Sequence, residues 1–60
     1  MQREKFAAFV ARERKRKKLS KYAMAKALGK DWGTIHRWER GDNAPKDDAL
    51  PYWVQRIESL

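Results

Sequence analysis

The fold of this chain is decided by residues 19–41, which read LSKYAMAKALGKDWGTIHRWERG. Apolar spacing predicts one helix over 21–28 and a second from residue 32 to about residue 40. Only Gly29 and Lys30 separate the end of the first helix from the cap of the second. A break this short makes the two helices cross steeply instead of lying antiparallel.

The residues that flank these two helices favour helix ends. Ser20 and Asp31 belong to the types that accept a hydrogen bond at the N-cap position. Gly29 and Gly41 stand where a left-handed backbone ends a helix at little cost. The stretch therefore predicts a helix, a glycine turn and a second helix.

The second helix sorts its residues by face. Ile35 and Trp38 share one side at a spacing of i, i+3, and we expect Trp38 to lie in the core. The opposite side is basic, rich in hydrogen-bonding groups and nearly free of acid; it carries Trp32, Gly33, His36, Arg37 and Arg40. Such a face is typical of a helix that enters a DNA groove.

Helices are also predicted on both sides of this stretch. Residues 3–17 place Phe6, Phe9 and Val10 at helical spacing, and the rest of that segment is strongly basic. A last helix is expected after Pro45, with Asp47 or Asp48 as its cap, Pro51 in its first turn and an apolar stripe of Trp53, Val54, Ile57 and Leu60. No strand-like alternation persists, so the fold class is all-α with one small core.

Composition limits the function. The chain has 15 Lys and Arg against 8 Asp and Glu, a formal net charge of +7, which favours a polyanionic partner. It has no cysteine and one histidine, so we expect no disulfide, metal or cofactor. We expect no membrane association and a cytoplasmic, nucleoid-associated protein, because no apolar run approaches the ~20 residues of a spanning helix. Nucleophile, zinc and phosphate-loop motifs are missing, so we expect no enzyme.

Residues 19–41 resemble, without a gap, the helix-turn-helix of the Cro and phage-repressor (XRE-like) family. The matching residues are Leu19, Ser20, Ala25, Leu28, Gly29, Thr34, Ile35, Arg37, Trp38, Glu39, Arg40 and Gly41, with Arg14 and Pro45 at further family positions. The resemblance implies one compact, lambda-repressor-like domain of four to five helices over residues 1–60, with its helix-turn-helix at about 20–40. Residues 51–55 more weakly resemble the tail of small phage or mobile-element regulators such as anti-CRISPR-associated repressors.

The same resemblance implies roles for individual residues. Base contacts fall on Trp32, Gly33, Thr34, His36 and Arg37. Phosphate contacts fall on Lys18, Ser20, Lys21, Lys30, Arg40, Asn43 and Lys46, and a partly buried ion pair falls on Arg14 and Glu39. The chain departs from the family at Lys21, where glutamine is usual, at Lys30, where an apolar residue is usual, and at Ala23, where glutamate is usual.

Several alternatives stay open at this level. Arg37 either bonds O6 and N7 of guanine, contacts a phosphate or is a solvated side chain. Trp32 either stacks on a thymine methyl or sugar edge or folds back beside Tyr22. Tyr52 and Trp53 either form a dimer surface on the C-terminal helix or close the core of the monomer.

The expected function is a sequence-specific regulator of transcription that binds double-stranded DNA. It would act as an autoregulatory repressor, a homodimer on an inverted repeat, with no evident small-molecule ligand. The alternatives are an antitoxin-type protein that binds a partner protein as well as DNA, and an interaction module that uses the fold without reading bases.

Overall fold

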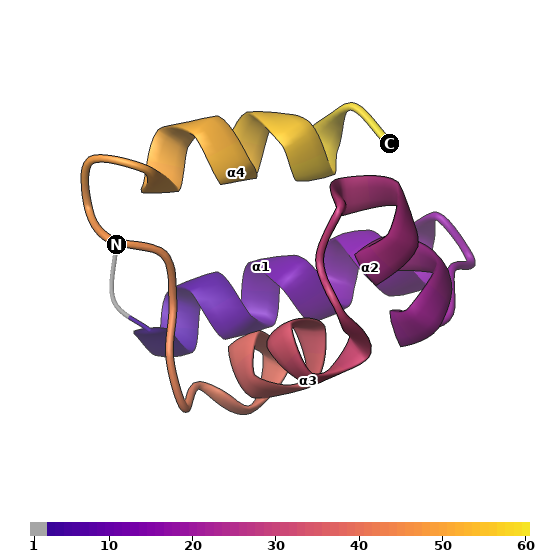
Figure 1. Ribbon diagram of the computed structural model, residues 1–60, viewed down its shortest axis with the longest axis horizontal. Coiled ribbons are helices and arrows are strands. Elements are labelled where there is room, and N and C mark those ends of the chain that lie inside the picture. The colour runs from indigo at the N-terminus through magenta and orange to yellow at the C-terminus, as the bar shows by residue number, and fades with distance from the viewer. Residues whose placement is uncertain (1–2) are drawn as a thin grey trace.

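The computed structural model describes residues 3–60. It contains α1 (Arg3–Arg16), α2 (Lys21–Leu28), α3 (Trp32–Arg40) and α4 (Leu50–Glu58). In Figure 1, α1 runs through the middle of the molecule, α4 lies on one side of it and α3 on the other, and α2 lies at one end. The all-α prediction is confirmed, and within residues 3–60 no helix is long and apolar enough to cross a membrane.

The core takes side chains from all four helices. The largest side chains that are fully buried are Phe6 and Val10 of α1, Met24 of α2, Ile35 of α3 and Ile57 of α4. Each such side chain contributes about 1.5–3 kcal/mol by leaving water. A small chain therefore joins its helices through one shared apolar centre.

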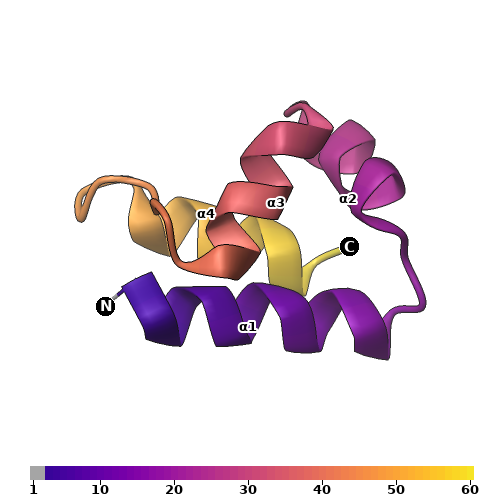
Figure 2. The ribbon, with the colours of Figure 1, turned by 90° about the horizontal axis from the view of Figure 1, so that it is seen from below.

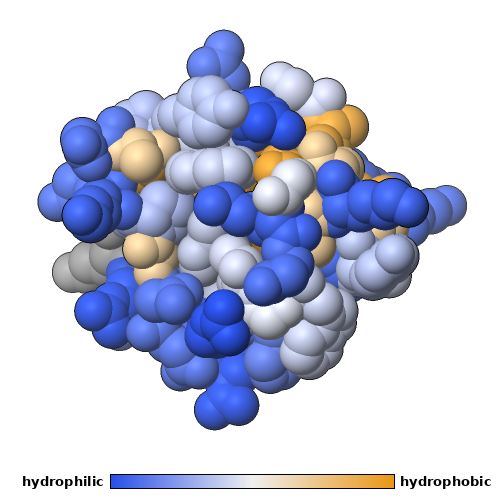
Figure 3. Space-filling view, in the orientation of Figure 1, coloured by the Kyte–Doolittle hydropathy of each residue, from blue (hydrophilic) through white to orange (hydrophobic). Residues whose placement is uncertain are grey.

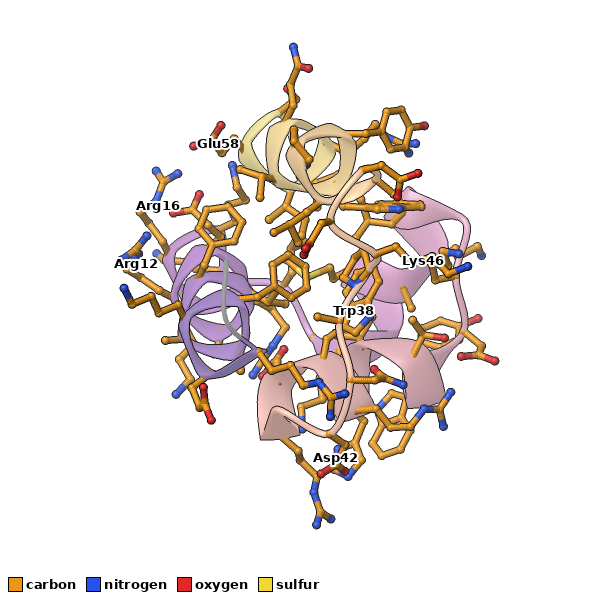
Figure 4. All side chains as sticks on the ribbon, turned by 90° about the vertical axis from the view of Figure 1, so that its left-hand side faces the viewer. Arg12, Arg16, Trp38, Asp42, Lys46 and Glu58 are labelled. Atoms are coloured by element: carbon orange, nitrogen blue, oxygen red, sulfur yellow. The ribbon has the colours of Figure 1, made fainter. Side chains whose placement is uncertain are left out.

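Trp38 connects the two sides of this centre. Its side chain is 5% exposed, which confirms the prediction that it lies in the core. Its ring meets Phe6 edge-on at 5.2 Å between centroids and Trp53 at 5.7 Å. Figure 4 shows Trp38 directed into the space that α1, α2 and α4 surround. Trp53 thus packs against the core of the monomer instead of standing free of it.

The caps that orient α2 and α3 form as predicted. Ser20 accepts a hydrogen bond from the Ala23 amide at 3.0 Å, and Asp31 accepts from the Thr34 amide at 2.7 Å. The Thr34 hydroxyl also donates to Asp31, and the two bonds lower the pKa of that carboxyl. Gly29 has φ +72° and Gly41 has φ +78°, conformations that other residues adopt only at a cost.

The prediction that Asp47 or Asp48 caps the last helix is wrong. The N-cap of α4 is Ala49, which has a helical backbone and no side-chain hydrogen bond. The carbonyl of Lys46 accepts from the amides of Ala49 and Leu50, both at 2.9 Å, so a backbone turn satisfies the donors that an aspartate would have bonded.

The end of α1 is joined to the end of α3 by an ion pair. Arg14 Nε donates to Glu39 Oε2 at 2.6 Å and Arg14 Nη2 to Glu39 Oε1 at 3.0 Å, a bidentate arrangement. The two side chains are 16% and 8% exposed. Arg14 also donates to the carbonyl of Leu19, at 3.0 Å, in the connection that leads into α2. One side chain therefore positions three segments.

This geometry predicts strong coupling between the two residues. Removing one partner of a buried pair costs about 3–5 kcal/mol because a charge is left without compensation. We expect Arg14→Met and Glu39→Gln each to cost at least about 2–3 kcal/mol, and the double variant to cost clearly less than the sum. Urea and thermal melts of the four proteins measure the coupling.

The exposed pair Arg40–Asp42 is the matched control. Its atoms are 3.3 Å apart and its side chains are 63% and 51% exposed, so its coupling should stay below about 1 kcal/mol. Equal coupling energies for the two pairs would contradict the role assigned to Arg14.

Candidate nucleic-acid interface

The outer face of α3 is the surface that the sequence predicted for DNA. Since Ile35 and Trp38 are buried, the residues between them turn outward. Trp32 is 49% exposed, Arg37 is exposed and His36 is half-buried. Figure 2 looks onto this helix, with α2 beside its N-terminal end.

The acid of α3 points away from this face. Glu39 is the one acidic residue in Trp32–Arg40, and its carboxylate is taken by Arg14. The ion pair that joins α1 to α3 therefore leaves the outer face of α3 itself with basic and neutral groups, and the exposed carboxylate near Arg37 is that of the N-cap Asp31. A polyanion meets no carboxylate from α3 there.

Arg37 lies across the first turn of its own helix. A Cβ atom built on Gly33 would stand 3.0 Å from Arg37 Nη1 and 3.6 Å from Cζ. The absence of a side chain at Gly33 leaves room for the guanidinium in this position, and the contact involves only the flexible end of Arg37. The planar group is held at the N-terminal half of α3, the part that enters the groove in helix-turn-helix proteins.

A small cluster lies between α2 and α3 and consists of Lys21, Trp32 and His36. Lys21 Nζ lies 3.1 Å from His36 Nδ1. The imidazole stacks on the Trp32 ring, with centroids 4.5 Å apart and planes inclined by 14°. Lys21 Nζ also lies 5.8 Å from the centre of that ring. Trp32 thus neither stands free nor is buried in the core.

The structure places the predicted phosphate residues in different surroundings. The hydroxyl of Ser20 caps α2, Arg40 pairs with Asp42, and Asn43 is exposed. Lys30 Nζ lies 4.8 Å from the centre of the Trp53 ring, toward α4. Lys46 is exposed, on the segment that leads to α4 (Figure 4). Among the side chains of these predicted phosphate residues, that of Lys21 forms a hydrogen bond with a predicted base-reading residue, His36.

Sequence reasoning missed the pocket beside this face. A cavity of about 300 Å³ is lined by Tyr22, Ala25, Lys26, Lys30, Asp31 and Trp32. Tyr22 is 63% exposed and shares this pocket with Trp32, although their rings do not stack on each other. The sequence did contain one indication of this pocket, because helical spacing places Tyr22, Ala25 and Lys26 on one face of α2. Among residues 3–60, no group of three potential ligand side chains could hold a metal ion.

A short helix presented across a glycine turn, with an outer face of cations and hydrogen-bonding groups, defines a DNA-binding helix-turn-helix domain. A comparison with known families agrees, because a family described as helix-turn-helix matches residues 10–50. The chain belongs to this family, in its Cro and phage-repressor type, whose members are DNA-binding regulators and generally not enzymes. Comparisons with curated proteins and with solved structures gave no match.

Lys18 provides a test of the predicted phosphate contacts. It lies two residues after the end of α1 with φ +59°, a conformation that favours glycine and costs other residues roughly 1–2 kcal/mol. We expect Lys18→Gly to raise the free energy of unfolding by up to about 1 kcal/mol while it weakens DNA binding and lowers the log–log salt slope by about one unit. Chemical melts and binding titrations at several salt concentrations measure both effects.

Lys5→Gln is the matched control, because it removes the same charge near the other end of α1. It should leave the salt slope unchanged. A Lys18→Gly protein that keeps the full slope would remove Lys18 from the phosphate contacts.

Proposed function

We propose that the chain is a sequence-specific repressor of transcription that acts in the cytoplasm, at the nucleoid. In this proposal, α3 lies in the major groove of an inverted-repeat operator, and two copies bind its two half-sites. Repression is steric, because a bound dimer covers the promoter, including that of its own gene. Membership in a family of DNA-binding regulators supports the general class, and the geometry of α3 supports the finer assignment.

The observation that carries this proposal is the placement of Arg37. Its guanidinium lies over Gly33 on an exposed helix face whose acid is turned inward. A guanidinium can donate two parallel hydrogen bonds to O6 and N7 of guanine, which gives about 1–3 kcal/mol of discrimination.

Arg37→Ala should therefore lose specificity more than affinity. The operator comes from repeated selection of a random duplex library by the wild-type protein. We expect the variant to bind that operator about 10- to 100-fold less tightly and a scrambled duplex nearly as well as the wild type does. Competition binding with the two duplexes gives both numbers. An equal loss on both would place Arg37 on a phosphate and would sink its assignment as a base reader.

The proposed dimer surface is the outer face of α4. Tyr52 is 53% exposed and Leu60 is 37% exposed, whereas Trp53 packs against the core. Figure 3 shows apolar residues gathered at the edge of the molecule where the C-terminal end of α4 lies near α2. A two-fold dimer would place two copies of α3 about 34 Å apart, one turn of DNA. It would also double the number of base contacts that one small domain can make.

Stoichiometry tests the dimer. We expect two copies per operator at saturating protein, and we expect Tyr52→Glu to weaken operator binding while half-site binding stays unchanged, since a charge at the contact opposes pairing. Light scattering and gel-shift titrations with full and half operators measure this. Glu58→Gln, a change of charge at the same helix, is the control. One copy bound per full operator would overturn the dimer.

A further inference from the structure

We infer that His36 reads a hydrogen-bond acceptor on a base edge through a proton on Nε2, and that Lys21 and Trp32 fix the tautomer and the orientation of its ring. This inference rests on the proposed function, because it assigns His36 a part in base recognition. It adds the kind of atom that His36 recognises and the residues that select it.

The tautomer follows from the contact with Lys21. A lysine ammonium has three donors and no acceptor. Its hydrogen bond to His36 Nδ1, at 3.1 Å, therefore requires that Nδ1 carry a lone pair. In a neutral imidazole one nitrogen accepts and the other donates, so the proton of this ring is on Nε2.

The orientation of the ring is fixed by a second contact. The Trp32 ring lies nearly parallel to the imidazole at 4.5 Å, so the imidazole cannot tilt without losing the stack. Turning the ring over would place a carbon instead of Nδ1 against Lys21 and would lose the hydrogen bond. The stack therefore fixes the plane of the ring, and the hydrogen bond fixes which edge of the ring faces Lys21. Lys21 is a positioning residue here, and two of its three donors remain for a phosphate.

One polar atom of the ring, Nε2, then remains for DNA, and it only donates. In the major groove the acceptors are O6 and N7 of guanine, N7 of adenine and O4 of thymine. Cytosine presents only its N4 donor. His36 should therefore disfavour cytosine at the base that it faces, by about three- to tenfold for a single hydrogen bond.

The first arm of the test needs no DNA. His36 is the one histidine in the sequence, so the two ring nitrogens can be assigned without ambiguity in a nitrogen-15 spectrum. At a pH where the ring is neutral, we expect the wild-type protein to show protonated Nε2 and unprotonated Nδ1. Lys21→Met should shift the Nδ1 signal and mix the two tautomers. Lys26→Met, on the same helix with its ammonium near Tyr22, should change neither signal.

The second arm compares sequence profiles selected from a random duplex library. We expect His36→Ala and Lys21→Met to relax the preference at the same base pair by about three- to tenfold. The double variant should relax it no further than His36→Ala does, and Lys26→Met should keep the profile.

The two arms separate the ways in which the inference can fail. If the wild-type protein carries the proton on Nδ1, or if the ring nitrogen signals are the same in Lys21→Met as in the wild type, the tautomer assignment is wrong whatever the DNA results are. If the wild-type protein enriches an operator and Lys21→Met selects the same sequence profile, the role of Lys21 is wrong and the proposed function stands. A wild-type protein that enriches no sequence would overturn the proposed function, and base reading by His36 with it.

Discussion

The guanidinium of Arg14 contacts three parts of the chain at once, and the rest of the structure depends on this arrangement. It bonds both oxygens of Glu39 and the carbonyl of Leu19, so α1, the connection into α2 and the end of α3 are fixed relative to each other. A core this small supplies limited apolar contact, and the sequence has no cysteine from which a disulfide could form. The partly buried ion pair of Arg14 and Glu39 instead fixes the orientation of α3 relative to α1. Because the carboxylate of Glu39 pairs with Arg14, the same interaction keeps this acid off the exposed face of α3.

Local hydrogen bonds explain why much of the fold could be predicted from the sequence. The caps at Ser20 and Asp31 and the left-handed ends at Gly29 and Gly41 depend on residues within a few positions of each other, so their types and spacing were sufficient. The start of α4 was predicted wrongly because a backbone carbonyl, which every residue has, replaced the expected side-chain cap. The amino-acid sequence does not indicate where a backbone carbonyl will take the place of a side-chain cap.

The candidate site was predictable only in part. Helical spacing separated the outer face of α3 from Ile35 and Trp38, because that separation follows from the period of one helix. The contact between Lys21 and His36 joins residues 15 positions apart on two helices and depends on how those helices cross. The use of Gly33 was also hidden, because only the structure shows where the Arg37 guanidinium lies. The aromatic residues divide in the same way. Trp38 followed from its spacing, whereas the division between a half-buried Trp53 and an exposed Tyr52 required the packing of α4.

The way α4 is attached has a consequence for how such a domain can diversify. Lys17 Nζ donates to the carbonyls of Glu58 and Leu60, at 3.0 and 2.9 Å, and Arg56 donates to the carbonyl of Ala27 at 3.2 Å. These acceptors belong to the backbone, so they persist when the side chains at their positions are replaced. The outward residues of α4 other than Arg56 can therefore change while these bonds persist, and none of the bonds involves α3. Mutations on the outward face of α4 can thus change what that face presents to its surroundings while the position of α3 is preserved.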